Sequence, residues 1–101
     1  MRKAKIYNFG RFAGILIEEN GKYIFSYEDN YSGPPISRTM PLEKREYKFT
    51  NFPPFFDGLL PEGNQLEALL KLNKIDRYDY FSQLLAVGKE LVGSVTVEED
   101  K

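Results

Sequence analysis

The sequence predicts an α+β fold, with a small antiparallel β-sheet of about four to five strands and two main helices packed on it. Three observations lead to this prediction. The first forty residues contain runs of β-forming residues, an Asn20-Gly21 pair separates two of these runs, and the second half changes to a helical spacing of leucines. A chain of 101 residues has room for one domain, and we assign residues 1–101 to it.

Three strands are expected in the first part of the chain. Residues Ala4–Phe9 have strand composition and end at a Gly10-Arg11 turn, and Phe12–Glu19 forms the next strand. In Tyr23–Tyr27 the aromatic residues alternate and share one face. Asn20-Gly21 accepts the positive φ angles of a type I′ turn, so the second and third strands form a hairpin.

Less regular chain follows the hairpin. Glu28–Pro35 has turn chemistry that is incompatible with a central strand. Ile36–Met40 is a candidate for a short strand, and the charged segment Leu42–Phe49 is expected to be irregular. Near the end of the chain, Gly93–Glu98 alternates valines with polar residues, which predicts a final strand that returns to the sheet.

The second half predicts two helices after a short apolar segment. Phe52–Leu60 has prolines near its start and is typical of one or two helical turns. Pro61 suits the first turn of a helix that runs to about Lys74, with an apolar stripe formed by Leu66, Leu69 and Leu70. The second helix begins at Asp76 as N-cap and stops at Gly88. Its buried face consists of Tyr80, Phe81, Leu84 and Leu85.

The composition excludes several classes of function. Lys and Arg (14) against Asp and Glu (15) leave a net charge of −1, so no strong field draws the chain to nucleic acid or an anionic membrane. Cys and His are absent, which removes thiol nucleophiles, imidazole bases, disulfides and nearly every zinc or haem site. No apolar run approaches the roughly 20 residues that span a bilayer. We therefore expect a cytoplasmic protein without cofactor or metal.

Two sequence patterns resemble catalytic motifs but have simpler explanations. Gly88–Ser94 has the glycine spacing of a P-loop, but it lacks the lysine and follows a helix instead of a strand. A helix end followed by a strand start explains it better. Carboxylate pairs in turns, caps and charged loops are better explained by capping or solvation than by acid–base catalysis. These pairs are Glu18/Glu19, Glu28/Asp29, Glu43/Glu46 and Asp76/Asp79.

Two binding interpretations remain. Tyr23, Phe25 and Tyr27 on one strand face could stack on nucleic-acid bases, but no basic stripe accompanies them. The segment Phe52–Gly63 has too many large apolar side chains for all of them to be buried, which indicates a surface patch that binds a partner. The alternative is that its apolar side chains plug the open end of the sheet; these are Phe55, Phe56, Leu59 and Leu60.

The run Phe55–Gly63 (FFDGLLPEG) resembles the signature FF-(D/E)-(G/N)-LLP-(E/D) in the N-terminal subdomain of the HipA family of toxin kinases. The likeness covers essentially the whole chain. Further segments that agree in order are Tyr7–Gly14, Tyr27–Pro35, Asp79–Leu85 and Val87–Val95. One departure is Ile36–Met40, which carries Arg38 where the family is mostly apolar or hydroxylic.

The resemblance implies a function without catalysis. A HipA kinase continues well beyond this subdomain and carries its nucleotide loop and catalytic aspartate there, so no catalytic residue transfers to this chain. A free-standing subdomain is similar to the HipS family, the antitoxins of tripartite HipB–HipS–HipT toxin–antitoxin systems. This likeness implies that the chain binds and neutralises a HipT-like serine/threonine kinase toxin. A HipB-like DNA-binding protein is reached through the complex, without direct contact to nucleic acid or membrane.

The signature segment is the expected partner-binding site, with the residues Phe55, Phe56, Asp57, Leu60, Pro61, Glu62, Gly63, Asn64 and Gln65. Among them Glu62, Asn64 and Gln65 are expected to project, because the leucine stripe of the following helix determines which side faces the sheet. Two alternatives stay open: an N-terminal structural fragment of a HipA-type kinase, and a small nucleic-acid-binding domain.

Overall fold

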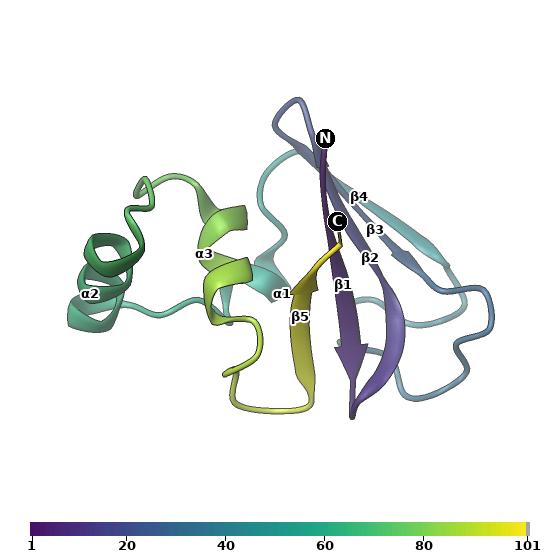
Figure 1. Cartoon of the computed structure of the whole chain (residues 1–101). Helices are drawn as coiled ribbons and strands as arrows, with labels where there is room; N and C mark the ends of the chain where they lie inside the picture. The colour runs from purple at the N-terminus through teal and green to yellow at the C-terminus, as the bar shows by residue number, and fades with distance from the viewer. Residues whose placement is uncertain (101) are drawn as a thin grey trace.

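The computed structural model describes residues 1–100, which form a five-stranded sheet and three helices (Figure 1). The strands are β1 (Arg2–Asn8), β2 (Arg11–Glu19), β3 (Lys22–Tyr27), β4 (Glu46–Phe49) and β5 (Val95–Glu99). They lie in the order β4-β3-β2-β1-β5, and all neighbours are antiparallel. The helices are α1 (Pro54–Asp57), α2 (Gly63–Asn73) and α3 (Tyr80–Val87). The predicted α+β class is confirmed.

Tight turns connect the first three strands. Asn20 and Gly21 have φ angles of 54° and 76°, the pair of positive values that a type I′ turn requires, so the predicted hairpin is confirmed. Phe9 and Gly10, with φ angles of 52° and 79°, form the turn between β1 and β2. This turn lies one residue earlier than the predicted Gly10-Arg11.

The segment Ile36–Met40 forms turns instead of the short strand that its composition predicts. Its backbone is bonded to a side chain, because the Ile36 N–H donates to the Tyr27 hydroxyl (3.1 Å) and that hydroxyl donates to the Met40 carbonyl. Ile36 and Met40 are buried, so the loop closes one end of the core. The Tyr27 hydroxyl thus provides hydrogen bonds to this segment, which has no neighbouring strand to pair with.

The segment Glu46–Phe49, expected to be irregular, is the edge strand β4. Tyr47 and Phe49 pair with core residues of β3 and pack against the core, while Glu46 and Lys48 are exposed. This alternation is the period of a half-buried strand. The charge of the surrounding segment hides it in the sequence.

The core lies on one face of the sheet, where α1, α3 and the loop between β3 and β4 cover it. Its fully buried side chains include Ile6, Leu16, Phe25, Phe56, Phe81 and Leu84. The opposite face is open to solvent and carries the half-buried Ile15, Ile17 and Ile24 beside charged residues. Directly opposed charges, such as Lys5 and Glu98, balance one another on this open face.

The two longer helices pack differently, although both were expected on the sheet. Helix α3 contacts β5 and buries Phe81 and Leu84. Helix α2 packs against α3 and stands apart from the sheet (Figure 1), and every one of its side chains is at least partly exposed. Its stripe of three leucines is narrow and half-buried.

The N-cap of α3 is Asp79, which corrects the prediction of Asp76. The Asp79 carboxylate accepts a hydrogen bond from the Ser82 N–H (3.2 Å), as an N-cap does. Asp76 instead accepts from the Tyr78 N–H (2.8 Å) and shapes the turn before the helix. Helix α2 likewise begins at Gly63, two residues after the predicted Pro61.

The close packing of Gly88 on β5 predicts a sharp difference between two glycines. Gly88 and Gly58 both have helical φ angles, −56° and −64°. A Cβ at Gly88 would overlap with the Val97 carbonyl, whereas the nearest atom to a Cβ at Gly58 is 3.5 Å away. We expect Gly88→Ala to lower the free energy of unfolding by about 2–4 kcal/mol. Gly58→Ala should change it by less than about 1 kcal/mol. Urea denaturation followed by circular dichroism measures both, and equal losses would contradict the packing.

Candidate functional site

The predicted partner-binding segment begins in the core and ends in solvent. Phe56 is 0% exposed, and its ring centroid lies 6.0 Å from that of Phe25 and 5.1 Å from that of Phe55. Asp57 and Gly58 are exposed, and residues 59–61 are half-buried. The buried phenyl ring therefore anchors the point at which the chain leaves the body of the molecule.

Backbone hydrogen bonds keep the segment tightly turned as far as Leu60. The Asp57 N–H donates to the Pro53 carbonyl (3.0 Å), and the Leu60 N–H donates to the Asp57 carbonyl (3.1 Å). Pro61 has no N–H with which to continue the turn, and Glu62 is extended, with φ −129° and ψ 166°. The chain then starts α2 in a new direction.

The nine predicted site residues fall into three environments. Phe55 is half-buried and Phe56 buried, so both face the core, as the alternative interpretation expects. Leu60 and Pro61 are half-buried and line a groove. The remaining residues are exposed; they are Asp57, Glu62, Gly63, Asn64 and Gln65. The segment thus presents a polar helix start beside an apolar groove.

The groove has a volume of about 360 Å³ and separates the predicted segment from the end of α3 and the loop that follows it. One wall is formed by Gly58, Leu59, Leu60, Pro61 and Gln65, and the other by Val87, Glu90, Leu91 and Val92. Val92 is 96% exposed, whereas Leu91 packs against the core. The predicted site does not include the second wall. The one signal for this wall in the sequence is the apolar pair Leu91-Val92 in the polar run GKELVGS.

An exposed ion pair and a helix cap hold α2 in place. The guanidinium of Arg77 donates to both carboxylate oxygens of Glu67, each at 2.7 Å. Lys74 takes a left-handed conformation at the end of α2, and the next N–H, that of Ile75, donates to the Leu70 carbonyl (3.0 Å). The loop that follows also exposes Tyr78, whose exposed fraction is 75%.

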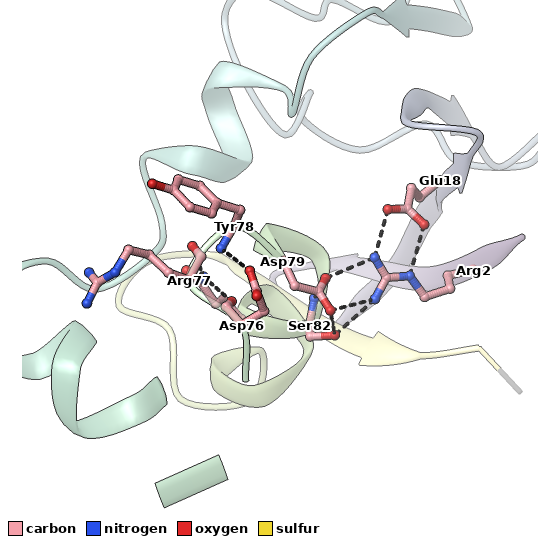
Figure 2. Close-up of polar contacts among 8 residues, drawn as sticks. Arg2, Glu18, Asp76, Arg77, Tyr78, Asp79 and Ser82 are labelled. Carbon is pink, nitrogen blue, oxygen red and sulfur yellow. Dashed lines mark hydrogen bonds and ion pairs between the residues drawn. The ribbon is translucent and has the colours of Figure 1, made fainter. Parts of the chain in front are cut away.

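A cluster around Arg2 ties α3 to the sheet (Figure 2). The Arg2 guanidinium donates to both carboxylate oxygens of Glu18 on β2, at 2.9 and 2.7 Å. It also donates to Asp79 (2.9 and 3.3 Å) and to the Ser82 hydroxyl (2.9 Å), both at the start of α3. The polar side chains of this cluster bond to one another, and the cluster positions α3 on the sheet.

The charges of this cluster are stabilised in their ionised forms. Hydrogen bonds from Arg2 hold the pKa of the Glu18 carboxyl below its ordinary value. Partial burial by itself raises the pKa of Asp79, but hydrogen bonds from Arg2 and Ser82 outweigh it and leave that pKa lowered. The pKa of Arg2 is raised, chiefly by its hydrogen bonds to Glu18.

The part of the chain that the structure describes contains no site for metal binding, base stacking or membrane crossing. Among residues 1–100, no group of three or more His, Cys, Asp or Glu side chains is arranged to hold a metal ion. Tyr23, Phe25 and Tyr27 are 8%, 0% and 4% exposed, so base stacking on that strand face is excluded. Within the same residues, no helix has the length and apolar character needed to cross a membrane.

Known proteins resemble this chain over its whole length. A family model described as HipA N-terminal domain matches residues 4–98. A protein of Haemophilus influenzae, described as uncharacterized, is 33% identical over 101 residues, which are 100% of this chain and 95% of that protein. A solved structure described as the N-terminal domain of HipA toxin is 29% identical and matches with a TM-score of 0.81. The match covers 100% of this chain and 94% of that one.

The Arg2 cluster predicts a pH-dependent stability. In Arg2→Met, Glu18 and Asp79 lose their cation, and we expect a loss of about 1 kcal/mol near neutral pH, given their partial exposure. Both folded pKa values lie below the ordinary values of 4.5 and 3.8, so this stabilisation is complete above those values and disappears as the pH falls through the folded ones. The difference between wild type and variant should therefore shrink below about pH 4.

Urea denaturation at about pH 7, 4 and 2.5 measures this difference. Arg77→Met is the matched control, because it removes an arginine from the exposed pair with Glu67 and should cost less than Arg2→Met near neutral pH. A difference between wild type and Arg2→Met that stays constant across the pH range would contradict the assignment of the stabilisation to these charges.

Proposed function

Because the chain belongs to the HipA N-terminal domain family, we propose that it is a HipS-like antitoxin that binds and neutralises a HipT-like serine/threonine kinase toxin. The family predicted from the signature Phe55–Gly63 is confirmed by the match over residues 4–98. The kinase and its neutralisation are the proposal. The role is one of binding, and the proposed mechanism uses no catalytic residue of this chain.

The length of a relative supports a subdomain that acts as a separate molecule. The alignment with the Haemophilus influenzae protein covers 95% of that protein, so a chain of about this size exists there without an attached kinase. A subdomain supplied by a separate chain can occupy the kinase surface that a fused subdomain covers in a HipA kinase. This is how we propose that it acts on a kinase encoded separately.

The position of α2 is the structural observation that best supports a partner-binding role. The helix stands apart from the sheet (Figure 1), while Phe56 fixes the segment that leads into it. Its first residues, Gly63, Asn64 and Gln65, are all exposed. Beside them lies the apolar groove with Leu60 and Pro61. Exposed apolar surface rimmed by polar residues on a firmly held support is typical of a protein-binding site.

We propose that the chain reaches its other partner only through the kinase. In a tripartite system, the complex would connect the chain to a HipB-like DNA-binding protein, and we propose no direct contact with nucleic acid. A net charge of −1 fits this indirect connection. We propose that this complex acts in the cytoplasm.

The match to the N-terminal domain of HipA toxin also fits the alternative that the chain is a structural part of a HipA-type kinase. The neighbouring reading frame distinguishes the two functions. For an antitoxin, it should encode a kinase that lacks this subdomain.

Substitutions at the start of α2 test the proposed contact. Asn64→Arg and Gln65→Arg place long cations on exposed positions, so the fold should be retained. We expect each to weaken binding to the kinase encoded beside the chain by about tenfold or more, because an interface has no room for them. The loss should also abolish rescue of growth when the kinase is co-expressed.

Biolayer interferometry with the purified kinase measures the affinity, and circular dichroism confirms the fold. Asn30→Arg, an exposed asparagine in the loop after β3, is the matched control and should bind within about twofold of wild type. Unchanged affinity in both α2 variants would remove this segment from the interface. A wild-type chain that fails to bind the kinase would contradict the proposed function itself.

A further inference from the structure

We infer that the groove between Leu59–Pro61 and Leu91-Val92 receives an apolar side chain of the partner kinase that stands next to a lysine or arginine. The inference rests on the proposed function for the identity of the partner. It extends that function by naming the chemistry of the kinase segment. It also adds a second contact surface, the loop after α3, to the signature segment.

The walls of the groove favour an apolar occupant. Leucine, proline and valine side chains form most of the lining, namely Leu59, Leu60, Pro61, Val87, Leu91 and Val92. Val92 is 96% exposed at the rim, so a bound apolar group would remove it from water. The volume of about 360 Å³ lies at the lower end of ligand-pocket sizes, which suits a side chain and not a whole structural element.

Both walls are held in place before a partner arrives. The Leu60 N–H donates to the Asp57 carbonyl (3.1 Å) on one side, and the Glu90 N–H donates to the Val87 carbonyl (2.9 Å) on the other. Leu60 and Leu91 also pack against the core. A preformed groove requires little ordering on binding, which favours affinity.

The charges at the groove favour a cation next to the apolar group. Glu90 is the one charged residue among those that line it, and Gln65 supplies an amide. The carboxylates of Asp57 and Glu62 adjoin the lining residues along the chain. None of these three carboxylates forms an ion pair with any residue from 1 to 100. An incoming lysine or arginine would be attracted there, and an acidic residue would be repelled.

The neighbouring Lys89 does not line the groove; together with Glu90 it lines another cavity, between α3 and β5. The open face of the sheet lacks such a bias. There Lys5 lies opposite Glu98, and Lys48 approaches Glu46 at 3.9 Å. Glu90 is thus the one charged residue that lines this apolar groove.

Two substitutions test the groove against the kinase. Val92→Asp should weaken binding by about tenfold or more, because it places a carboxylate on the apolar wall. Glu90→Lys should weaken binding by about fivefold at about 50 mM NaCl and by less than about twofold at about 500 mM, because salt screens the repulsion between cations. The matched controls, Ser32→Asp and Glu43→Lys, lie at exposed positions of the loop between β3 and β4 and should stay within about twofold of wild type.

If the wild-type chain binds the kinase and both groove variants bind it as tightly as the wild type does, the inference is overturned and the proposed function stands. The same holds if Glu90→Lys loses affinity to the same extent at both salt concentrations, because the charge argument then fails. If the wild-type chain binds no kinase, the proposed function fails, and the kinase as occupant fails with it.

A titration without the kinase decides the chemistry of the groove independently. N-acetyl-Leu-Arg-amide, added at millimolar concentration to the full ¹⁵N-labelled chain, should shift the amide resonances of Gln65, Leu91 and Val92. N-acetyl-Leu-Glu-amide should shift them several-fold less, and Val92→Asp should abolish the effect. Equal shifts with the two peptides, or no shift at these amides, would overturn the proposed preference for a cation.

Discussion

The burial of Phe56 is the constraint on which the exposed half of the molecule depends. Its ring lies in the core against Phe25, and a single helical turn connects it to Leu60. From that point α2 extends away from the sheet, with α3 as its main support. Without a fixed Phe56, the exposed residues of the signature segment would have no defined position, and a preformed binding surface requires one.

Helix α3 provides the second fixed point, and two kinds of interaction hold it. Phe81 and Leu84 are fully buried against the sheet, and Arg2 joins the Asp79 cap to Glu18 on β2. The Arg2 guanidinium also lies 4.9 Å from the centroid of the Phe81 ring. The two walls of the groove are thus attached to the same core through different elements.

Features encoded by neighbouring residues could be predicted from the sequence, and features encoded by distant contacts could not. Asn20-Gly21 predicts its hairpin because two positive φ angles are a local requirement. The signature FFDGLLPEG predicts the family because it is a contiguous pattern. By contrast, charged residues surround the alternation of β4 and hide it, and the identical side chains of Asp76 and Asp79 do not show which of the two caps α3. The wall formed by Leu91-Val92 depends on the packing of α3 beside residues 58–61, which no local pattern indicates.

The measurement that tests the central claim most directly is amide hydrogen exchange of the full chain, alone and with the kinase encoded beside it. A chain that acts by binding through α2 and the groove should gain protection in residues 59–72 and 87–92. Exchange in the β2–β3 hairpin should stay unchanged, because the hairpin is part of the sheet, from which α2 stands apart (Figure 1). Protection confined to the sheet, or an exchange pattern that the kinase leaves unaltered, would contradict this account.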